Sequence, residues 1–251
     1  MQEGNYPMSF KSKVLAAAVT VTVVGGVSSV GVLSAGAATP SCGNSCIDIF
    51  SRQFDTHHNP QFVMDVFHGS VSVGQPIILF RSSNSDGAED FTISFQGLVS
   101  DFFAAGLVSA ALNLHYGGGS AGSVDDPAFE IEYSPFGVES GLCVGTATTA
   151  IQGEGVTLQP CGVSGKTVWV LDTFDQPFTF FFHGEAPLIN GSDNNFSHPF
   201  VLTYPSNGFP TDIPRPQLKV TNLTGFSNGF GPIVGTVIDA QLWGANFGVI
   251  K

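Results

Sequence analysis

A pair of glutamates, two residues apart in the sequence, has a spacing that suits acid–base chemistry. Glu130 and Glu132 fall in a predicted strand at 129–133, so both lie on one face of the sheet. Paired carboxyl groups can act as acid and base on a glycosidic bond. A strand face in contact with solvent has the same spacing. We expect the solvated face, and a hydrolase that uses Glu130, Glu132 or Asp65 is the less favoured alternative.

The other titratable side chains lack the spacings of known metal sites and nucleophiles. A group of histidines and acidic residues could meet a cation but fits no calcium-binding loop: His57, His58, Asp86, Glu89 and Asp90. No G-x-S-x-G motif occurs, and no cysteine is left over as a nucleophile. The sequence therefore predicts no catalytic residue, no metal and no cofactor.

The N-terminal segment has the three parts of a secretory signal peptide. Lys11 and Lys13 precede an uncharged run over 14–33, and the small residues Ala35-Gly36-Ala37 follow it. We expect a signal peptide at 1–37 with cleavage after Ala37. The alternative is a retained membrane anchor, because the run is about long enough to span a bilayer. Glycine and serine dilute the run, so we favour cleavage, secretion and no membrane span after processing.

All four cysteines lie after the predicted cleavage site. Their even number in an exported chain implies disulfides, and nearness in the sequence favours Cys42–Cys46 and Cys143–Cys161. The second bond closes a loop of about 19 residues, which corresponds to roughly 3 kcal/mol of stabilisation.

Composition excludes several classes of protein. The 251 residues carry 8 Lys and Arg against 20 Asp and Glu, a net charge of −12, and loss of residues 1–37 makes this −13. A chain this acidic is a poor nucleic-acid binder, because phosphate backbones need clustered Lys and Arg. With 43% apolar and only 11% charged residues, it is not a disordered protein either.

Short runs rich in β-branched and aromatic residues follow one another along the chain, separated by turn residues. This pattern is typical of an all-β barrel or sandwich. The predicted strands are 47–50, 62–67, 76–80, 91–95, 129–133, 142–146, 156–159, 167–171, 188–190, 200–204, 217–221 and 238–243. A segment near 98–125 breaks the pattern. Its apolar residues over 98–114 partly fit a helix, and a hairpin is the alternative.

The twelve strands divide into three stretches with one order of parts. The stretches cover about 42–97, 126–182 and 185–251 and contain four strands each. A unit that cannot bury its apolar face alone packs against its copies. We therefore expect a single domain at 38–251, built as a threefold barrel of three four-stranded repeats with one insertion.

Two motifs of these repeats resemble a known family. Gly141-Leu142-Cys143-Val144, followed by Val156–Cys161 and Thr167-Val168-Trp169, is similar to one repeat of a ricin-type β-trefoil lectin. Gln241-Leu242-Trp243 matches the family's Q-x-W element in full. The resemblance covers roughly 42–251 without the insertion, and it implies a β-trefoil fold.

The resemblance also implies positions for a sugar site. The family binds sugar with an Asp after the first cysteine position, an aromatic platform and an Asn-Gln pair. The first repeat has Asp65 and Phe80 for the first two, and Ala88-Glu89 in place of the pair. The second repeat has Gly145 and Gln159, and the third has Thr203 for the Asp and Ala240-Gln241 for the pair.

These observations lead to an exported, non-catalytic binding protein. The expected partner is a neutral carbohydrate, bound in the first repeat by Asp65, Phe80 and Glu89. The alternative is a trefoil scaffold that has lost its sugar sites and contacts an extracellular protein or surface.

Overall fold

The computed structural model describes residues 46–51, 62–83, 86–119, 124–171, 185–204, 216–224 and 237–247. These residues all belong to one compact unit, Thr39–Lys251. The predicted signal peptide and Cys42 lie outside the described residues, so cleavage after Ala37 and the Cys42–Cys46 bond stay predictions, as do the domain limits. No helix of the described ranges has the length and apolar character needed to cross a membrane.

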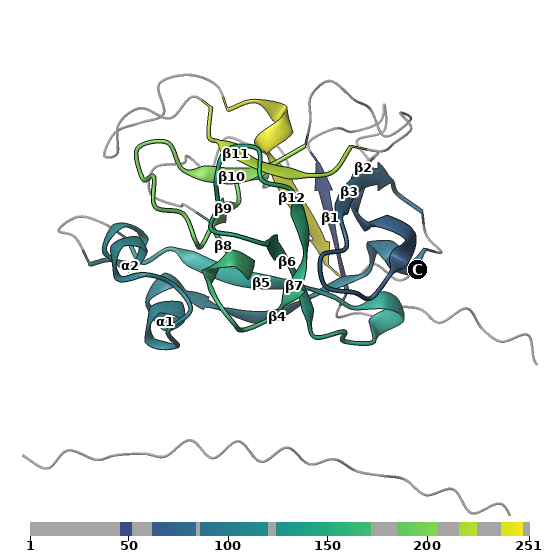
Figure 1. Cartoon of the computed structure of the whole chain (residues 1–251), viewed down its shortest axis with the longest axis horizontal. Coiled ribbons are helices and arrows are strands. Elements are labelled where there is room, and N and C mark those ends of the chain that lie inside the picture. The colour runs from purple at the N-terminus through teal and green to yellow at the C-terminus, as the bar shows by residue number, and fades with distance from the viewer. Residues whose placement is uncertain are drawn as a thin grey trace, which may run out of the picture. The chain divides into compact units, whose positions relative to one another are not determined.

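The described residues form twelve strands, and each of the three predicted repeats supplies four of them (Figure 1). The first repeat contains β1 (Ile47–Ser51), β2 (Phe62–Val66), β3 (Ile77–Arg81) and β4 (Phe91–Leu98). The second contains β5 (Pro127–Tyr133), β6 (Leu142–Thr146), β7 (Val156–Pro160) and β8 (Val168–Val170). The third contains β9 (Ile189–Asn190), β10 (Phe200–Thr203), β11 (Lys219–Asn222) and β12 (Trp243–Phe247).

The first and last strands of the repeats pair into a closed ring. β1 pairs with β4, β4 with β5, β5 with β8, and β8 with β9, all antiparallel. β12 pairs with β1 along its whole length. The ring closes between Ala186, just before β9, and Trp243, where each backbone N–H donates to the other residue's carbonyl at 2.8 and 3.0 Å.

The middle strands of each repeat form hairpins that meet one another. β2 pairs with β3, β6 with β7, and β10 with β11. Backbone hydrogen bonds join the three hairpins, from Leu158 N to Gln75 O, from Val156 N to Leu218 O and from Leu218 N to Ile77 O. A six-stranded barrel with three joined hairpins is the β-trefoil arrangement, so the predicted fold is confirmed.

Three aromatic residues mark the threefold repetition of the core. Phe91, Trp169 and Trp243 begin or lie within the last strands of the three repeats, and all three are buried in one apolar cluster. Trp169 Nε1 donates to Val144 O and Trp243 Nε1 donates to Leu202 O, both at 2.9 Å. Because Val144 and Leu202 hold the same hairpin position, the same contact occurs in the second and third repeats.

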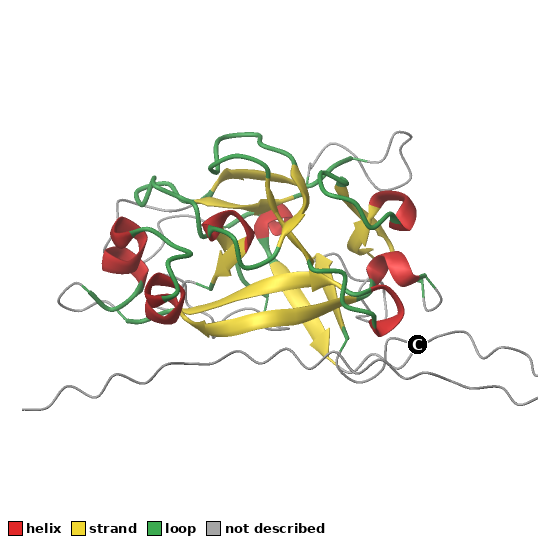
Figure 2. Cartoon of the chain, turned by 60° about the horizontal axis from the view of Figure 1, so that its bottom comes forward, coloured by secondary structure: helices red, strands yellow, loops and turns green. Residues whose placement is uncertain are grey.

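The insertion near 98–125 forms two short helices rather than a hairpin. These are α1 (Val99–Ala104) and α2 (Ala110–Tyr116), which contact each other at one edge of the molecule (Figures 1 and 2). Gly106 separates them with a φ of +75°, a conformation that ends a helix at little cost for glycine. Their apolar residues build a second buried cluster with the outward side chains of β8, β9 and β10.

The prediction for the last strand was wrong in its position. The sequence placed it at 238–243, whereas β12 begins at Trp243 and Asp239–Gln241 forms a short 3-10 helix, η6. The same turn precedes the last strand of the other repeats, as η2 (Gly87–Glu89) and η4 (Gly165–Thr167). The predicted Cys143–Cys161 disulfide is present, with a Cα–Cα distance of 5.0 Å.

Candidate functional site

The predicted sugar site of the first repeat lies on the outer face of the β2–β3 hairpin. Phe62, Met64 and Val66 point into the barrel core, so Asp65 points the other way. Asp65 stands opposite Ile78 in the register, and Phe80 is diagonal to it on the same face. The structure therefore brings Asp65 and Phe80 to one surface of the hairpin. Phe80 is partly exposed, whereas Asp65 is only 3% exposed.

Tyr133 and the 3-10 helix η2 lie close to this carboxylate. β2 packs against η2, and η2 contacts η1 (Phe67–Gly69) and η3 (Pro135–Gly137). The Tyr133 hydroxyl donates to Gly69 O at 3.1 Å. Its pKa is raised first by burial and then by the charges of Asp65, Asp86 and Asp90. The negative charges of three aspartates and burial thus keep this phenol protonated, so it remains a hydrogen-bond donor at neutral pH.

Glu89, the third predicted ligand, is fully buried in η2. Both of its carboxylate oxygens accept from Ser83 N, at 2.7 and 3.0 Å. This contact fastens the chain after β3 to the turn before β4. The direct role of Glu89 in sugar binding stays a prediction, and the bond to Ser83 gives the residue a structural role of its own.

The second repeat has no room at the equivalent position. Gly145 stands opposite Thr157 in β6–β7, as Asp65 stands opposite Ile78. A Cβ atom on Gly145 would lie 2.5 Å from the carbonyl oxygen of Lys166, in η4. Backbone therefore fills the place that a carboxylate holds in the first repeat. The side chain at the platform position, Gln159, donates to Thr157 Oγ1 at 2.8 Å.

The third repeat uses the equivalent position in an internal hydrogen-bond network. Thr203 Oγ1 donates to Val201 O at 3.0 Å and lies 2.8 Å from Thr221 Oγ1. Gln241, the first residue of the Q-x-W element, is fully buried and donates to Asn222 O at 2.9 Å. Its Oε1 accepts from Thr224 N, also at 2.9 Å. Gln241 thus holds the chain after β11, as Glu89 holds the chain after β3.

The expectation of a solvated face for Glu130 and Glu132 was wrong. The two side chains do share a face of β5, but they are only 2% and 6% exposed. Glu130 accepts from Gly162 N through both oxygens at 3.0 Å and from Thr167 Oγ1. Glu132 accepts from Gly141 N at 2.7 Å, and burial is the main cause of its raised pKa. Both carboxylates therefore hold backbone and do not line an open cleft.

The other acidic residues weighed as cation ligands also accept from nearby backbone. Asp86 Oδ1 accepts from Ala88 N at 3.0 Å, and Asp90 Oδ2 accepts from Phe136 N at 2.9 Å. His57 and His58 lie outside the described residues. Within the described ranges, no group of three or more potential ligand side chains has the geometry of a metal site.

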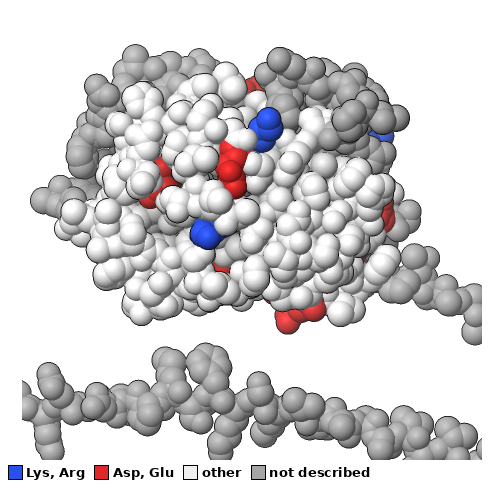
Figure 3. All heavy atoms as spheres, viewed as in Figure 1, with Lys and Arg blue, Asp and Glu red and all other residues white. Residues whose placement is uncertain are grey.

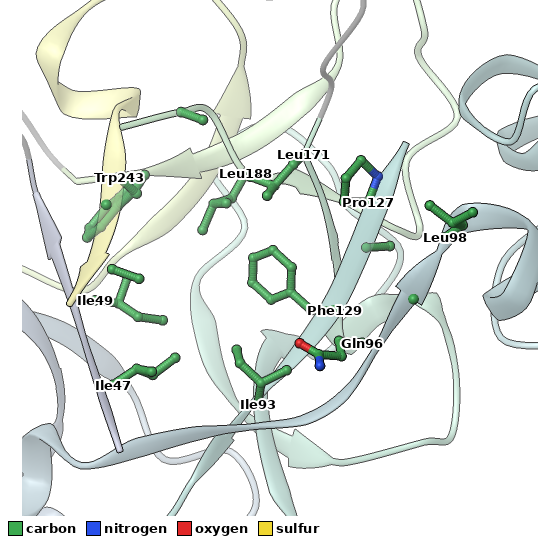
Figure 4. Close-up of a pocket in the computed structure, with 15 residues that line it drawn as sticks. Ile47, Ile49, Ile93, Gln96, Leu98, Pro127, Phe129, Leu171, Leu188 and Trp243 are labelled. Carbon is green, nitrogen blue, oxygen red and sulfur yellow. The ribbon is translucent and has the colours of Figure 1, made fainter. Parts of the chain in front are cut away.

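A cavity of about 690 Å³ opens in the barrel, in a place that the sequence did not suggest (Figure 4). Its walls come from β1, β4, β5 and β12 and from the chain beside β8 and β9, and no hairpin strand contributes. The inward positions of alternating strands were predicted to be core. The sequence pattern was ambiguous, because inward apolar residues alternate with outward residues both in a fully packed barrel and in a barrel with a cavity at one end.

Charged side chains are few on the face of the molecule shown in Figure 3. In its described part, basic and acidic side chains form a few small, scattered spots on a mostly uncharged surface. The charges of the described acidic residues are therefore not gathered into one patch on that face.

Comparisons with known proteins give structural likeness alone. No protein-family profile and no curated protein matches the chain. A designed 3-fold symmetric protein, ThreeFoil, is similar over 80% of this chain and 97% of its own, with 14% identity and a TM-score of 0.44. An exo-β-1,3-galactanase from Clostridium thermocellum is similar over 81% of this chain, with 11% identity and a TM-score of 0.44. The similarity spans only 30% of the galactanase. At these scores the fold assignment rests on the strand pairing described above.

Proposed function

We propose that the chain is an exported, non-catalytic binding protein that takes a neutral carbohydrate on the outer face of its first repeat. The observation that carries this proposal is the difference between the three equivalent hairpin positions. Asp65 is a carboxylate on the same face as a partly exposed ring, Phe80. Gly145 is closed off by backbone, and Thr203 is engaged in a network. A carboxylate is a strong acceptor for sugar hydroxyls, and the apolar side of a sugar stacks on a ring.

The burial of Glu130 and Glu132 supports a non-catalytic function. Acid–base work on a glycosidic bond needs two carboxyl groups that both reach the substrate. Glu130 and Glu132 are instead buried against Gly162 and Gly141. Export is supported by the Cys143–Cys161 disulfide, because such bonds persist in oxidising compartments.

The charge of the chain favours an uncharged ligand. A carboxylate accepts but does not donate, so Asp65 suits hydroxyl donors. The net charge of −13 after signal removal repels acidic glycans at long range. A glycan array that carries neutral and acidic sugars tests this proposal on the mature protein. We expect neutral glycans to bind, and we expect Asp65→Asn and Phe80→Ala to weaken their signal while Thr203→Val preserves it.

The burial of Asp65 and Glu89 favours a second candidate, a trefoil scaffold without a sugar site. Their exposed fractions are 3% and 0%, and Glu89 already accepts from Ser83 N. A scaffold would contact an extracellular protein or surface through side chains other than these. A silent array from a correctly folded mature protein selects this candidate over the lectin-like one.

A further inference from the structure

The barrel is packed at one end and hollow at the other. Beside the hairpins, the core is filled by buried aliphatic side chains such as Met64, Leu79 and Leu158, none of them more than 2% exposed. Toward the other end the apolar lining stays partly exposed at Ile93, Phe129 and Leu171. Interiors normally pack as densely as organic crystals. A cavity of about 690 Å³ is therefore a departure from the packing of the same barrel a few residues away.

The lining has the chemistry of a site for an apolar molecule. Aliphatic side chains and two aromatic rings, Phe129 and Trp243, make up most of its wall (Figure 4). Among the described lining residues, Gln96 is the one with an amide side chain, and its carboxamide points toward Phe129 and Ile93 (Figure 4). Small-molecule sites typically measure about 300–1,000 Å³ and combine apolar walls with a few polar groups.

None of the lining residues that the structure describes carries a charge, and this restricts the ligand further. A buried ion without a partner pays a large desolvation cost. The acidic chain adds long-range repulsion for anions such as carboxylates. A fatty acid or another apolar anion is disfavoured on both grounds, whereas an uncharged molecule with one hydrogen-bonding group matches Gln96.

We propose that the mouth of the barrel binds an uncharged, largely apolar small molecule, with the Gln96 carboxamide bonding its single polar group. Trp243 fixes the inner wall of the site, because its indole N–H is held by Leu202 O at 2.9 Å. This site is separate from the proposed sugar site, since none of its lining residues belongs to β2 or β3. The two proposals can therefore fail independently.

Fluorescence titration of the full mature protein with two dyes tests the proposal. Nile red is neutral and apolar, and anilinonaphthalene sulfonate is an apolar anion. We expect saturable binding of one Nile red per chain, with the anionic dye at least tenfold weaker. Ile93→Asp places a charge in the wall, and Leu171→Trp fills the space. Each change should weaken Nile red at least tenfold, while Asp65→Asn leaves the dye affinity unchanged.

Val163→Asp is the matched control for a charge on an exposed apolar position, because Val163 is 68% exposed and does not line the cavity. Circular dichroism checks that each variant is folded. Because Ile93→Asp and Leu171→Trp change the cavity in different ways, the test still stands if one of them fails to fold. Absence of saturable Nile red binding overturns the proposal, as does binding that neither Ile93→Asp nor Leu171→Trp weakens.

Residues 172–184 contain five phenylalanines and lie outside the described residues. If Nile red binds only after these five phenylalanines are changed to serine, the proposal is also overturned. That result would mean that the chain itself occupies the cavity in the wild-type protein.

Discussion

The outer faces of the first and second repeats differ at one pair of equivalent positions, Asp65 and Gly145. Both residues follow a core residue in the second strand of a repeat, and both pair with the third strand. In the first repeat a carboxylate lies between the hairpin and η2. In the second, the carbonyl of Lys166 approaches Gly145 so closely that no side chain fits. A repeated fold can thus keep its backbone plan and still close one copy of a ligand position.

Placing the missing carboxylate in the second repeat has the largest expected effect on stability. Gly145→Asp forces a Cβ atom to within 2.5 Å of Lys166 O and buries a charge without a prepared partner. We expect the free energy of unfolding to fall by about 4 kcal/mol, the order seen for buried charges without partners. Urea denaturation measures it, with the exposed Val138→Asp as control. A Gly145→Asp protein as stable as wild type would show that the second position is open after all.

The disulfide is a second difference between the repeats. Cys143 occupies the hairpin position that Val63 holds in the first repeat and Val201 in the third. Removing the bond in a Cys143→Ser, Cys161→Ser protein should cost about 3 kcal/mol of stability, from the loop-entropy relation. Thermal unfolding with and without reductant checks this. A double variant that unfolds at the same temperature as the oxidised wild type would contradict this prediction.

The third repeat supplies a buried carboxylate that lacks the partners of Glu130. Asp193 is 1% exposed, and its Oδ2 has no hydrogen-bond partner in the part of the chain that the structure describes. Burial raises the pKa of Asp193 to about 6, although backbone amides such as Asn195 N oppose the shift. Between about pH 4 and pH 6, the native state therefore keeps a proton on Asp193 that the unfolded state has released.

Stability should consequently fall as pH rises from about 4 to 6, by up to about 3 kcal/mol. Asp193→Asn removes the titrating group, so its free energy of unfolding should lack this fall and exceed that of wild type at pH 7. Denaturant titrations at several pH values measure both slopes. Equal slopes in the two proteins would mean that Asp193 is not the group responsible.

Glu130 and Glu89 allow the loop-holding contacts of two repeats to be compared directly. Glu130→Ala leaves Gly162 N and Thr167 Oγ1 without their charged acceptor, which should cost about 2 kcal/mol. Glu89→Ala removes the charged acceptor of Ser83 N, in a part-buried contact, and should cost about 1 kcal/mol. Chemical denaturation of both variants gives the two values. A larger loss for Glu89→Ala would reverse this ranking.

Most of the fold could be predicted because each strand carries its own alternating pattern. Met64 and Asp65 illustrate this, since the alternation alone separates the core face from the outer face. The last strand was misplaced because 238–243 is apolar as a run, although Asp239–Gln241 turns before Trp243. The equivalent turn before Phe91 shows that a comparison of the repeats could have corrected it.

The site was harder to predict because its burial depends on segments far away in the sequence. Nothing near Glu130 indicates that Gly162 N will reach its carboxylate, 32 residues later in the chain. Likewise, the exposure of Asp65 depends on the packing of η2 against β2. Local patterns predict the face on which a side chain lies, but they do not predict what covers that face.

The proposed function requires that only the first repeat has kept a ligand position. Isothermal titration of the mature protein with the strongest neutral glycan from the array tests it most directly. We predict one site per chain, an affinity about tenfold lower in Asp65→Asn, corresponding to about 1.4 kcal/mol for a charged hydrogen bond, and no change in Thr203→Val, the matched position of the third repeat. More than one site per chain, or equal losses in the two variants, would contradict the claim.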